Sequence, residues 1–99
     1  MTVKLINRNT TGEFVIEGKL DANTSSELER LVTERAEQFE KVVLNLSGLT
    51  YISSAGLRAM KIIHMTMKKK GGELAVTSVA PTVMEVFEMT GFSQLLNFE

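Results

Sequence analysis

Residues 42–58 read VVLNLSGLTYISSAGLR, and this stretch decides the fold. It opens with a β-branched, nearly continuous apolar run, which predicts a central strand covered on both faces. Two adjacent serines, Ser53 and Ser54, come a few residues later and are followed by Ala55-Gly56-Leu57. Beyond the serines, apolar residues recur at helical spacing, at Leu57, Met60, Ile63 and Met67. The stretch therefore predicts a strand that passes into a helix, with both serines at the junction.

The junction is a favourable place for a phosphate. The first backbone N–H groups of a helix have no intrahelical partner, and the helix dipole is positive there. Serine is also a preferred N-cap, so a purely structural role for one of the hydroxyls is the plain alternative. The second hydroxyl and the small Ala55-Gly56 pair favour a surface that another protein approaches closely. From the residues alone, both interpretations stay open.

The residues before this stretch predict a hairpin and a helix. Strands are expected over 3–7 and 14–18, joined by a turn at 9–12. A helix is expected from about residue 24 to about residue 39, with Thr24 as its N-cap and Glu27 completing a capping box.

The residues after it predict two more pairs of elements. The helix that follows Ser54 is expected to end at Gly71-Gly72, before a strand over 74–77. A third helix is expected to begin at Pro81, with a capping box formed by Thr82 and Glu85, and to end at Gly91. An edge strand is expected over 95–98.

This order predicts an α/β fold, a single domain over residues 1–99. Strands alternate with helices after the hairpin, so right-handed crossovers should give a mixed, mostly parallel β-sheet with an N-terminal hairpin and three main helices.

Composition excludes several kinds of function. The chain has 99 residues and a net charge of −1, which gives no electrostatic reason to expect nucleic acid as a partner. It has no cysteine, which rules out disulfides and cysteine-based zinc sites. No apolar run approaches the roughly 18 residues needed to cross a bilayer, and no signal peptide is evident, so we expect a cytoplasmic protein.

The residues that catalysis would need are scarce. His64 is the only histidine, and it lies within the second helix, away from any metal-ligand or nucleophile motif. Nucleotide-binding and hydrolase motifs are missing. We therefore predict that the protein is not an enzyme and holds no metal or cofactor. The basic run Lys68-Lys69-Lys70 is interpreted as complementing the dipole at the end of that helix.

Asp21 is the other candidate site residue. It closes the segment Gly18-Lys19-Leu20-Asp21 at the end of the second expected strand. Because the carboxyl ends of parallel strands meet at one edge of a sheet, Asp21 is expected close to the serines. A cap or turn ahead of the first helix is the structural alternative.

Taken together, these residues resemble the STAS domain family, specifically the bacterial anti-sigma factor antagonists, and the resemblance covers essentially the whole chain. Gly18-Lys19-Leu20-Asp21 with Thr24 is similar to the family's Gly-x-Leu-Asp segment, and VVLNLSGL is similar to its central strand. YISSAGL resembles the family's phosphorylation loop. The later part of the pattern is matched by Gly71-Gly72-Glu73-Leu74 and by Pro81, Phe87 and Gly91.

The resemblance implies a partner-switching regulator. Its unphosphorylated form would bind an anti-sigma factor that is also a GHKL-type serine kinase, and would thereby release a sigma factor. The kinase would phosphorylate Ser54, and a metal-dependent serine phosphatase would reverse this. The residues expected to contact the partner are Asp21, Ser53, Ser54, Ala55, Gly56 and Leu57.

Two residues depart from the family pattern, and alternatives remain. Ser53 replaces the usual Asp and is the alternative phosphoacceptor, and Arg58 stands where Gly is common. The alternative function is a STAS scaffold that does not switch, or the soluble subunit of a transporter or sensory complex. A small hydrolase that uses the serine pair is a third hypothesis, disfavoured because no base lies near the serines.

Overall fold

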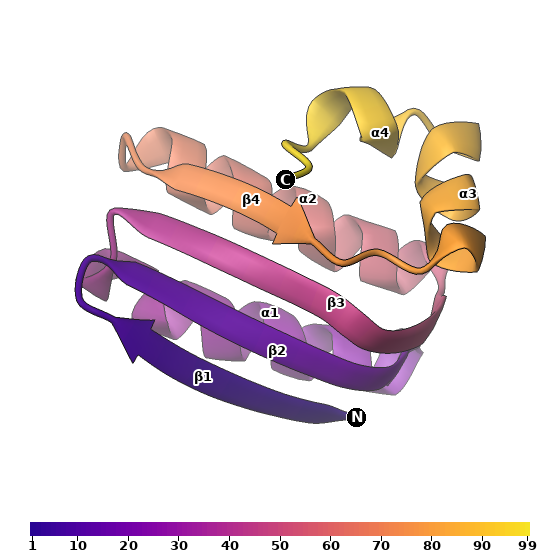
Figure 1. The fold of residues 1–99 in the computed structure, drawn as a ribbon, viewed down its shortest axis with the longest axis horizontal. Helices are drawn as coiled ribbons and strands as arrows, with labels where there is room; N and C mark the ends of the chain where they lie inside the picture. The colour runs from indigo at the N-terminus through magenta and orange to yellow at the C-terminus, as the bar shows by residue number, and fades with distance from the viewer.

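The computed structural model describes residues 1–99, which form a four-stranded sheet with two long helices against one face (Figure 1). The strand order is β1-β2-β3-β4. The strands are β1 (Thr2–Arg8), β2 (Thr11–Leu20), β3 (Lys41–Ile52) and β4 (Glu73–Thr77). The helices are α1 (Ala22–Arg35), the 3-10 turn η1 (Ala36–Gln38), α2 (Ser54–Lys69), α3 (Pro81–Met89) and α4 (Phe92–Leu95).

The sheet is mixed, as the sequence predicts. β1 and β2 form an antiparallel hairpin whose turn includes Asn9 at φ 70°, a left-handed conformation that Asn tolerates. β2 pairs with β3 and β3 pairs with β4 in parallel register. The predicted α/β class, with an N-terminal hairpin and a mostly parallel sheet, is confirmed.

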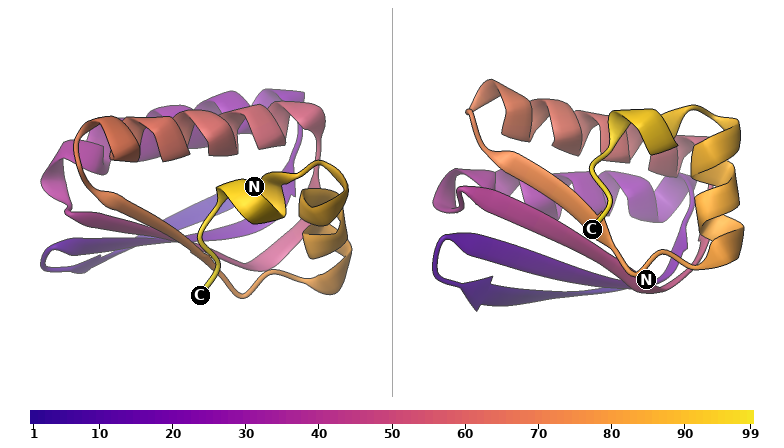
Figure 2. Two further views of the ribbon diagram at one scale, coloured as in Figure 1. Left: turned by 90° about the horizontal axis from the view of Figure 1, so that it is seen from above. Right: turned by 45° about the horizontal axis from the view of Figure 1, so that its top comes forward.

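The prediction that the central strand is covered on both faces is wrong. Burial alternates along β3: Val42, Leu44 and Leu46 are buried, whereas Val43 and Asn45 on the other face are only partly covered. Both α1 and α2 lie on the same side of the sheet (Figure 2). The crossovers from β2 to β3 and from β3 to β4 step across the sheet in one direction, so two right-handed connections put both helices on one face.

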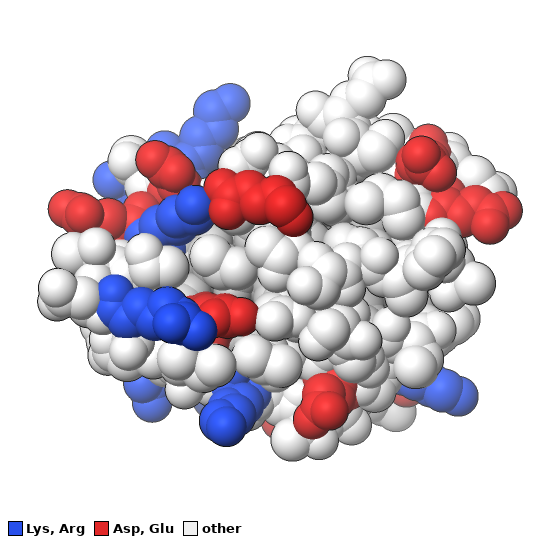
Figure 3. Space-filling model, viewed as in Figure 1, with Lys and Arg blue, Asp and Glu red and all other residues white.

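The other face of the sheet is open to solvent and carries an ordered polar group. In Figure 3, charged side chains gather toward one end of this face, and the middle is largely uncharged. Glu13 on β2 accepts hydrogen bonds from Asn45 (2.9 Å) and Arg8 (3.1 Å). The Asn45 amide, followed by the Arg8 guanidinium, holds the pKa of Glu13 below its usual value. At this end of the open face, the polar and charged side chains are therefore hydrogen-bonded to one another.

The third helix begins as predicted, but without the predicted cap. Pro81 is the first helical residue, and Ala80, which makes no side-chain cap, is the N-cap. The capping box of Thr82 and Glu85 is wrong, because the proline start places Thr82 inside the helix. Gly91 follows the helix with φ 82°, as its predicted role at the helix end requires.

The edge strand predicted at 95–98 is reduced to a single bridge with β4. Leu95 is the last residue of the short helix α4, and beyond it only Phe98 makes a β-bridge, to Val76. The backbone N–H of Val76 donates to the carbonyl of Asn97 (2.8 Å), and the N–H of Glu99 donates to the carbonyl of Val76 (3.0 Å). The rings of Phe92 and Phe98 both pack on Phe87, with centroids 6.4 and 5.6 Å from it. The Phe92 ring comes from α4 and the Phe98 ring from the residues after it, so aromatic packing holds this part of the chain against α3. No helix in the structure is long and apolar enough to cross a membrane.

Lys70 connects the end of α2 to the segment after α1. Its ammonium donates to the carbonyl of Ala36 (2.8 Å) and to that of Phe39. Lys70→Met keeps the apolar stem but leaves these carbonyls without their donor, so we expect the free energy of unfolding to fall by about 1–3 kcal/mol. Lys69→Met, at an exposed neighbouring position, is the matched control and should change it by less than about 0.5 kcal/mol. Urea denaturation measures both, and equal effects would contradict the role of Lys70.

Candidate functional site

The candidate site lies at the edge of the sheet where β2 and β3 end and α1 and α2 begin. Leu20 and Ile52 are register partners at the ends of the two strands. The backbone N–H of Ser53 donates to the carbonyl of Leu20 at 2.8 Å, so the chain segments that leave the two strands stay joined. Asp21 directly follows Leu20, and Ser53 directly follows Ile52. The structure therefore brings the two helix starts together, as the sequence predicts.

Asp21 caps α1. Its carboxylate accepts the backbone N–H groups of Asn23 and Thr24, each at 3.0 Å, and the Thr24 hydroxyl accepts the backbone N–H of Asp21 at 2.9 Å. The prediction that Thr24 is the N-cap is wrong, because Thr24 is the third helical residue and serves as the second half of a capping box that starts at Asp21. The Thr24 N–H and then its hydroxyl hold the pKa of the Asp21 carboxyl below its usual value.

The Asp21 cap predicts a pH dependence of stability. With a folded-state pKa below the unfolded value of about 3.9, the carboxylate stabilises the fold at neutral pH. This contribution is lost as the pH falls below about 4, through the folded-state pKa. Asn is an equally good N-cap that does not titrate, so Asp21→Asn should lower the pH dependence of Tm in this range. Thermal melts of both proteins at a series of acidic pH values measure it, and identical slopes would show that the cap does not titrate as described.

Ser53 caps α2, and this separates the two serines. Its hydroxyl accepts the backbone N–H of Gly56 at 3.2 Å, and its backbone is extended (φ −94°, ψ 177°), as an N-cap requires. Ser54 is the first helical residue, and its exposed side chain takes no part in the cap. The two hydroxyls, which the sequence leaves equivalent, therefore have different surroundings.

The three residues after Ser54 hold the helix start against the sheet. Gly56 is buried, and a Cβ at this position would lie 2.6 Å from Ile52 Cγ1 and 3.0 Å from Leu20 Cβ. Leu57 is half-buried and packs against the core, and Ala55 is half-buried. The absence of a side chain at Gly56 thus lets α2 approach the ends of β2 and β3.

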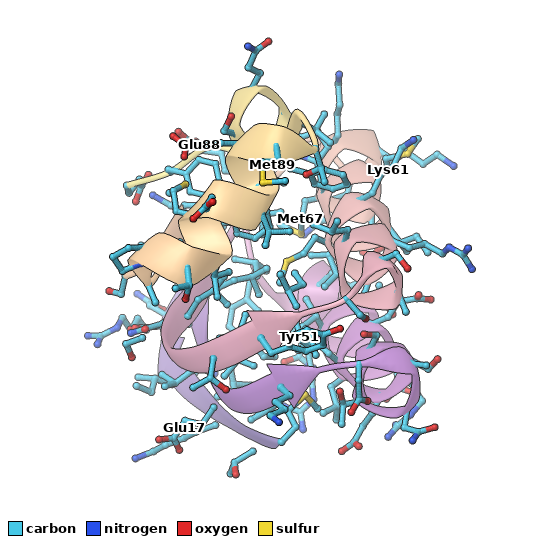
Figure 4. The ribbon with its side chains drawn as sticks, turned by 90° about the vertical axis from the view of Figure 1, so that its right-hand side faces the viewer. Glu17, Tyr51, Lys61, Met67, Glu88 and Met89 are labelled. Atoms are coloured by element: carbon cyan, nitrogen blue, oxygen red, sulfur yellow. The ribbon has the colours of Figure 1, made fainter.

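Two exposed large apolar side chains were not predicted. Tyr51, at the end of β3, is 49% exposed, and Met89, at the end of α3, is 78% exposed. Figure 4 shows both on the side of the molecule that faces the viewer. Sequence periodicity assigns such residues to the core, so only the three-dimensional arrangement identifies them as surface residues.

His64 lies too far from the serines to act on them. It is ten residues from Ser54 along α2, which corresponds to about 15 Å of helix axis. It lines a shallow groove of about 250 Å³ at the other end of the helix, together with residues such as Lys68, Leu95 and Asn97. No group of three or more His, Cys, Asp or Glu side chains is placed to hold a metal ion.

Comparisons with known proteins agree with this fold. The chain is 43% identical over 72 residues to BtrV of Bordetella bronchiseptica, named as a candidate anti-sigma factor antagonist; the match spans 69% of this chain and 62% of that relative. It is 31% identical over 83 residues to the anti-sigma F factor antagonist of Paenibacillus polymyxa, spanning 82% of this chain and 71% of the relative.

Solved structures show the same fold. The Bacillus anti-sigma factor antagonist SpoIIAA, in its unphosphorylated and phosphorylated forms, superposes with a TM-score of 0.77 over 99% of this chain at 15% identity, covering 87% and 91% of those chains. At this level of identity the likeness concerns the fold alone. The STAS domain model matches residues 3–99, and the chain therefore belongs to the STAS domain family.

Proposed function

We propose that this protein is an anti-sigma factor antagonist whose partner binding is switched by phosphorylation of Ser54. Its unmodified form binds an anti-sigma factor that is also a GHKL-type serine kinase, and so releases a sigma factor. The kinase then modifies Ser54, and a serine phosphatase restores the active form. The protein itself performs no catalysis in this scheme. The names of its relatives as anti-sigma factor antagonists support the role.

The proposal rests on the different surroundings of the two serines. Ser53 is occupied as the cap of α2, so phosphorylating it would cost the helix its N-cap hydrogen bond. Ser54 is exposed at the first helical position, where a phosphate needs no rearrangement of the fold. The positive end of the helix dipole favours the added charge by roughly 0.3–2 kcal/mol. Ser54 is therefore the better phosphoacceptor of the pair.

The same geometry explains how modification stops binding. A partner that packs on Ser54 and Ala55 meets small side chains, and Asp21 lies at the adjacent helix start as a further contact. A phosphoryl group adds a charge of about −1.5 to −2 at this surface. Burying such a charge without a partner costs several kcal/mol, so binding is lost while the fold is retained.

The experiment is phosphate incorporation by the cognate anti-sigma factor kinase with ATP, followed by intact-mass analysis. Ser54→Ala should show no added phosphate. Ser53→Asp is the matched control: it removes the other hydroxyl, keeps a good N-cap, and should be phosphorylated stoichiometrically. Full labelling of Ser54→Ala, with loss of labelling in Ser53→Asp, would assign the modification to Ser53 instead.

A further inference from the structure

The exposed face of α2 has an unusual composition. The helix has six exposed residues, and their spacing of three and four positions places all of them on one stripe. They are Ser54, Arg58, Lys61, Met65, Lys68 and Lys69. The stripe, which we call the α2 face, therefore consists of one serine, one methionine and four cations.

The cations of the α2 face have no acidic partners. α2 contains no Asp or Glu, and the three ion pairs of the protein, Arg8–Glu13, Arg30–Glu34 and Lys41–Glu99, all lie elsewhere. The chain as a whole carries a net charge of −1, so this concentration of positive charge is local. Figure 4 shows Lys61 on the outer side of α2, away from the sheet. Four unpaired cations on one helix face make it a site for a negatively charged partner.

Met65 gives the α2 face an apolar centre. It is 47% exposed and lies one helical turn from both Lys61 and Lys68. An apolar centre with a charged rim is the usual composition of a protein–protein interface. Ser54 lies at one end of the same stripe, so the charged surface is continuous with the proposed phosphorylation site.

We propose that the α2 face is a docking surface for a carboxylate-rich surface of the anti-sigma factor. This inference rests on the proposed function and adds the chemistry by which the partner is recognised. A protein fits better than a nucleic acid or a lipid surface because the cations surround the apolar Met65, and because the same stripe continues to Ser54, the proposed contact with the anti-sigma factor. In Figure 2, α1 lies beside α2, and its exposed charges include the Arg30–Glu34 ion pair.

This surface makes the switch an electrostatic one. Arg58 lies four residues after Ser54, a spacing at which helical side chains meet, so a phosphoryl group on Ser54 competes for the nearest cation of the α2 face. The phosphate also places negative charge where the partner presents its own carboxylates. Modification therefore removes an attraction and adds a repulsion at the same end of the interface.

The test measures affinity and association rate for the purified anti-sigma factor of the source bacterium, in about 50 mM and about 500 mM salt. Lys61→Glu/Lys68→Glu should bind at least about 10-fold more weakly at low salt, mainly through slower association, and the difference should shrink at high salt. Lys4→Glu/Arg35→Glu makes the same change in charge on β1 and α1 and is the matched control, expected within about 2-fold of the unmodified protein. Thermal melts verify that both variants fold.

Wild-type affinity in the Lys61→Glu/Lys68→Glu variant at low salt would overturn the inference. If the phosphorylated wild-type protein still loses binding in that case, only the docking surface is wrong; if it binds like the unmodified protein, the proposed function fails as well. Parallel titrations use duplex DNA and phosphatidylglycerol vesicles. The inference would also be overturned by a combination of two results. The first is that the wild-type protein binds DNA or vesicles and the Lys61→Glu/Lys68→Glu variant does not; the second is that both proteins bind the anti-sigma factor with the same affinity.

Discussion

A phosphoryl group on Ser54 is expected to weaken binding to the anti-sigma factor by at least about 100-fold while the protein stays folded. Loss of affinity follows from the position of Ser54, which is exposed beside Ala55 on a surface of small side chains. A buried and unpaired charge costs several kcal/mol, and each 1.4 kcal/mol is a factor of ten in Kd. The fold is retained because Ser53, and not Ser54, caps the helix.

Phosphoserine introduced at position 54 during synthesis allows this to be measured without the kinase. Isothermal titration gives the Kd of the modified and unmodified proteins, and thermal melts compare their stability. Ser54→Ala is the control and should bind within about 3-fold of the wild type, since it changes neither charge nor cap. A loss of binding that accompanies unfolding would mean that the phosphate disrupts α2 and does not act at the interface.

Gly56→Ala is expected to destabilise the protein by about 1–3 kcal/mol. The new Cβ would lie 2.6 Å from Ile52 Cγ1 and 3.2 Å from the carbonyl oxygen of Leu20, distances that force α2 away from the strand ends. The sign of the effect is informative. Without the close contacts, replacing a helical Gly by Ala would stabilise the protein by up to about 1 kcal/mol. Urea denaturation measures the difference, and a more stable Gly56→Ala protein would contradict the described packing.

A double-mutant cycle identifies the contact responsible. Ile52→Ala removes the Cγ1 atom that the new Cβ would meet, at the cost of a cavity in the core. The variant with both changes should lose less stability than the sum of the two single variants, with a coupling energy of at least about 0.5 kcal/mol. Additive losses would show that the substitution at Gly56 acts through another neighbour.

The four strands of the sheet and the three longer helices could be predicted from the sequence, because their patterns are local. The hairpin, the strand that leads into Ser53 and Ser54, and the start of α3 at Pro81 all follow from periodicity and turn residues. The cap of α1 was misplaced because Asp21 and Thr24 can each begin a capping box in this sequence. The N-cap is Asp21 because β2 ends at the preceding residue, Leu20. The position of this strand end depends on the pairing of β2 with β3.

The missed features depend on tertiary contacts. The uncovered sheet face follows from the strand order, which no single strand reveals. Phe92 and Phe98 pack on Phe87 of α3, a contact between separate segments that no local pattern reveals. Lys70 binds the carbonyls of Ala36, the first residue of η1, and of Phe39, which follows it, whereas its sequence position suggested the dipole of its own helix. The α2 face did leave a signal, since its cations recur at helical spacing, but their exposure and lack of partners are properties of the fold.

The most direct test of the central claim is release of the sigma factor. A preformed complex of the sigma factor and the anti-sigma factor is mixed with the unmodified protein, with the protein carrying phosphoserine at position 54, or with the same phosphoprotein after phosphatase treatment. Size-exclusion chromatography measures the free sigma factor. We expect release by the unmodified and dephosphorylated forms and none by the phosphorylated form. Equal release by all three, or release by none, would contradict it.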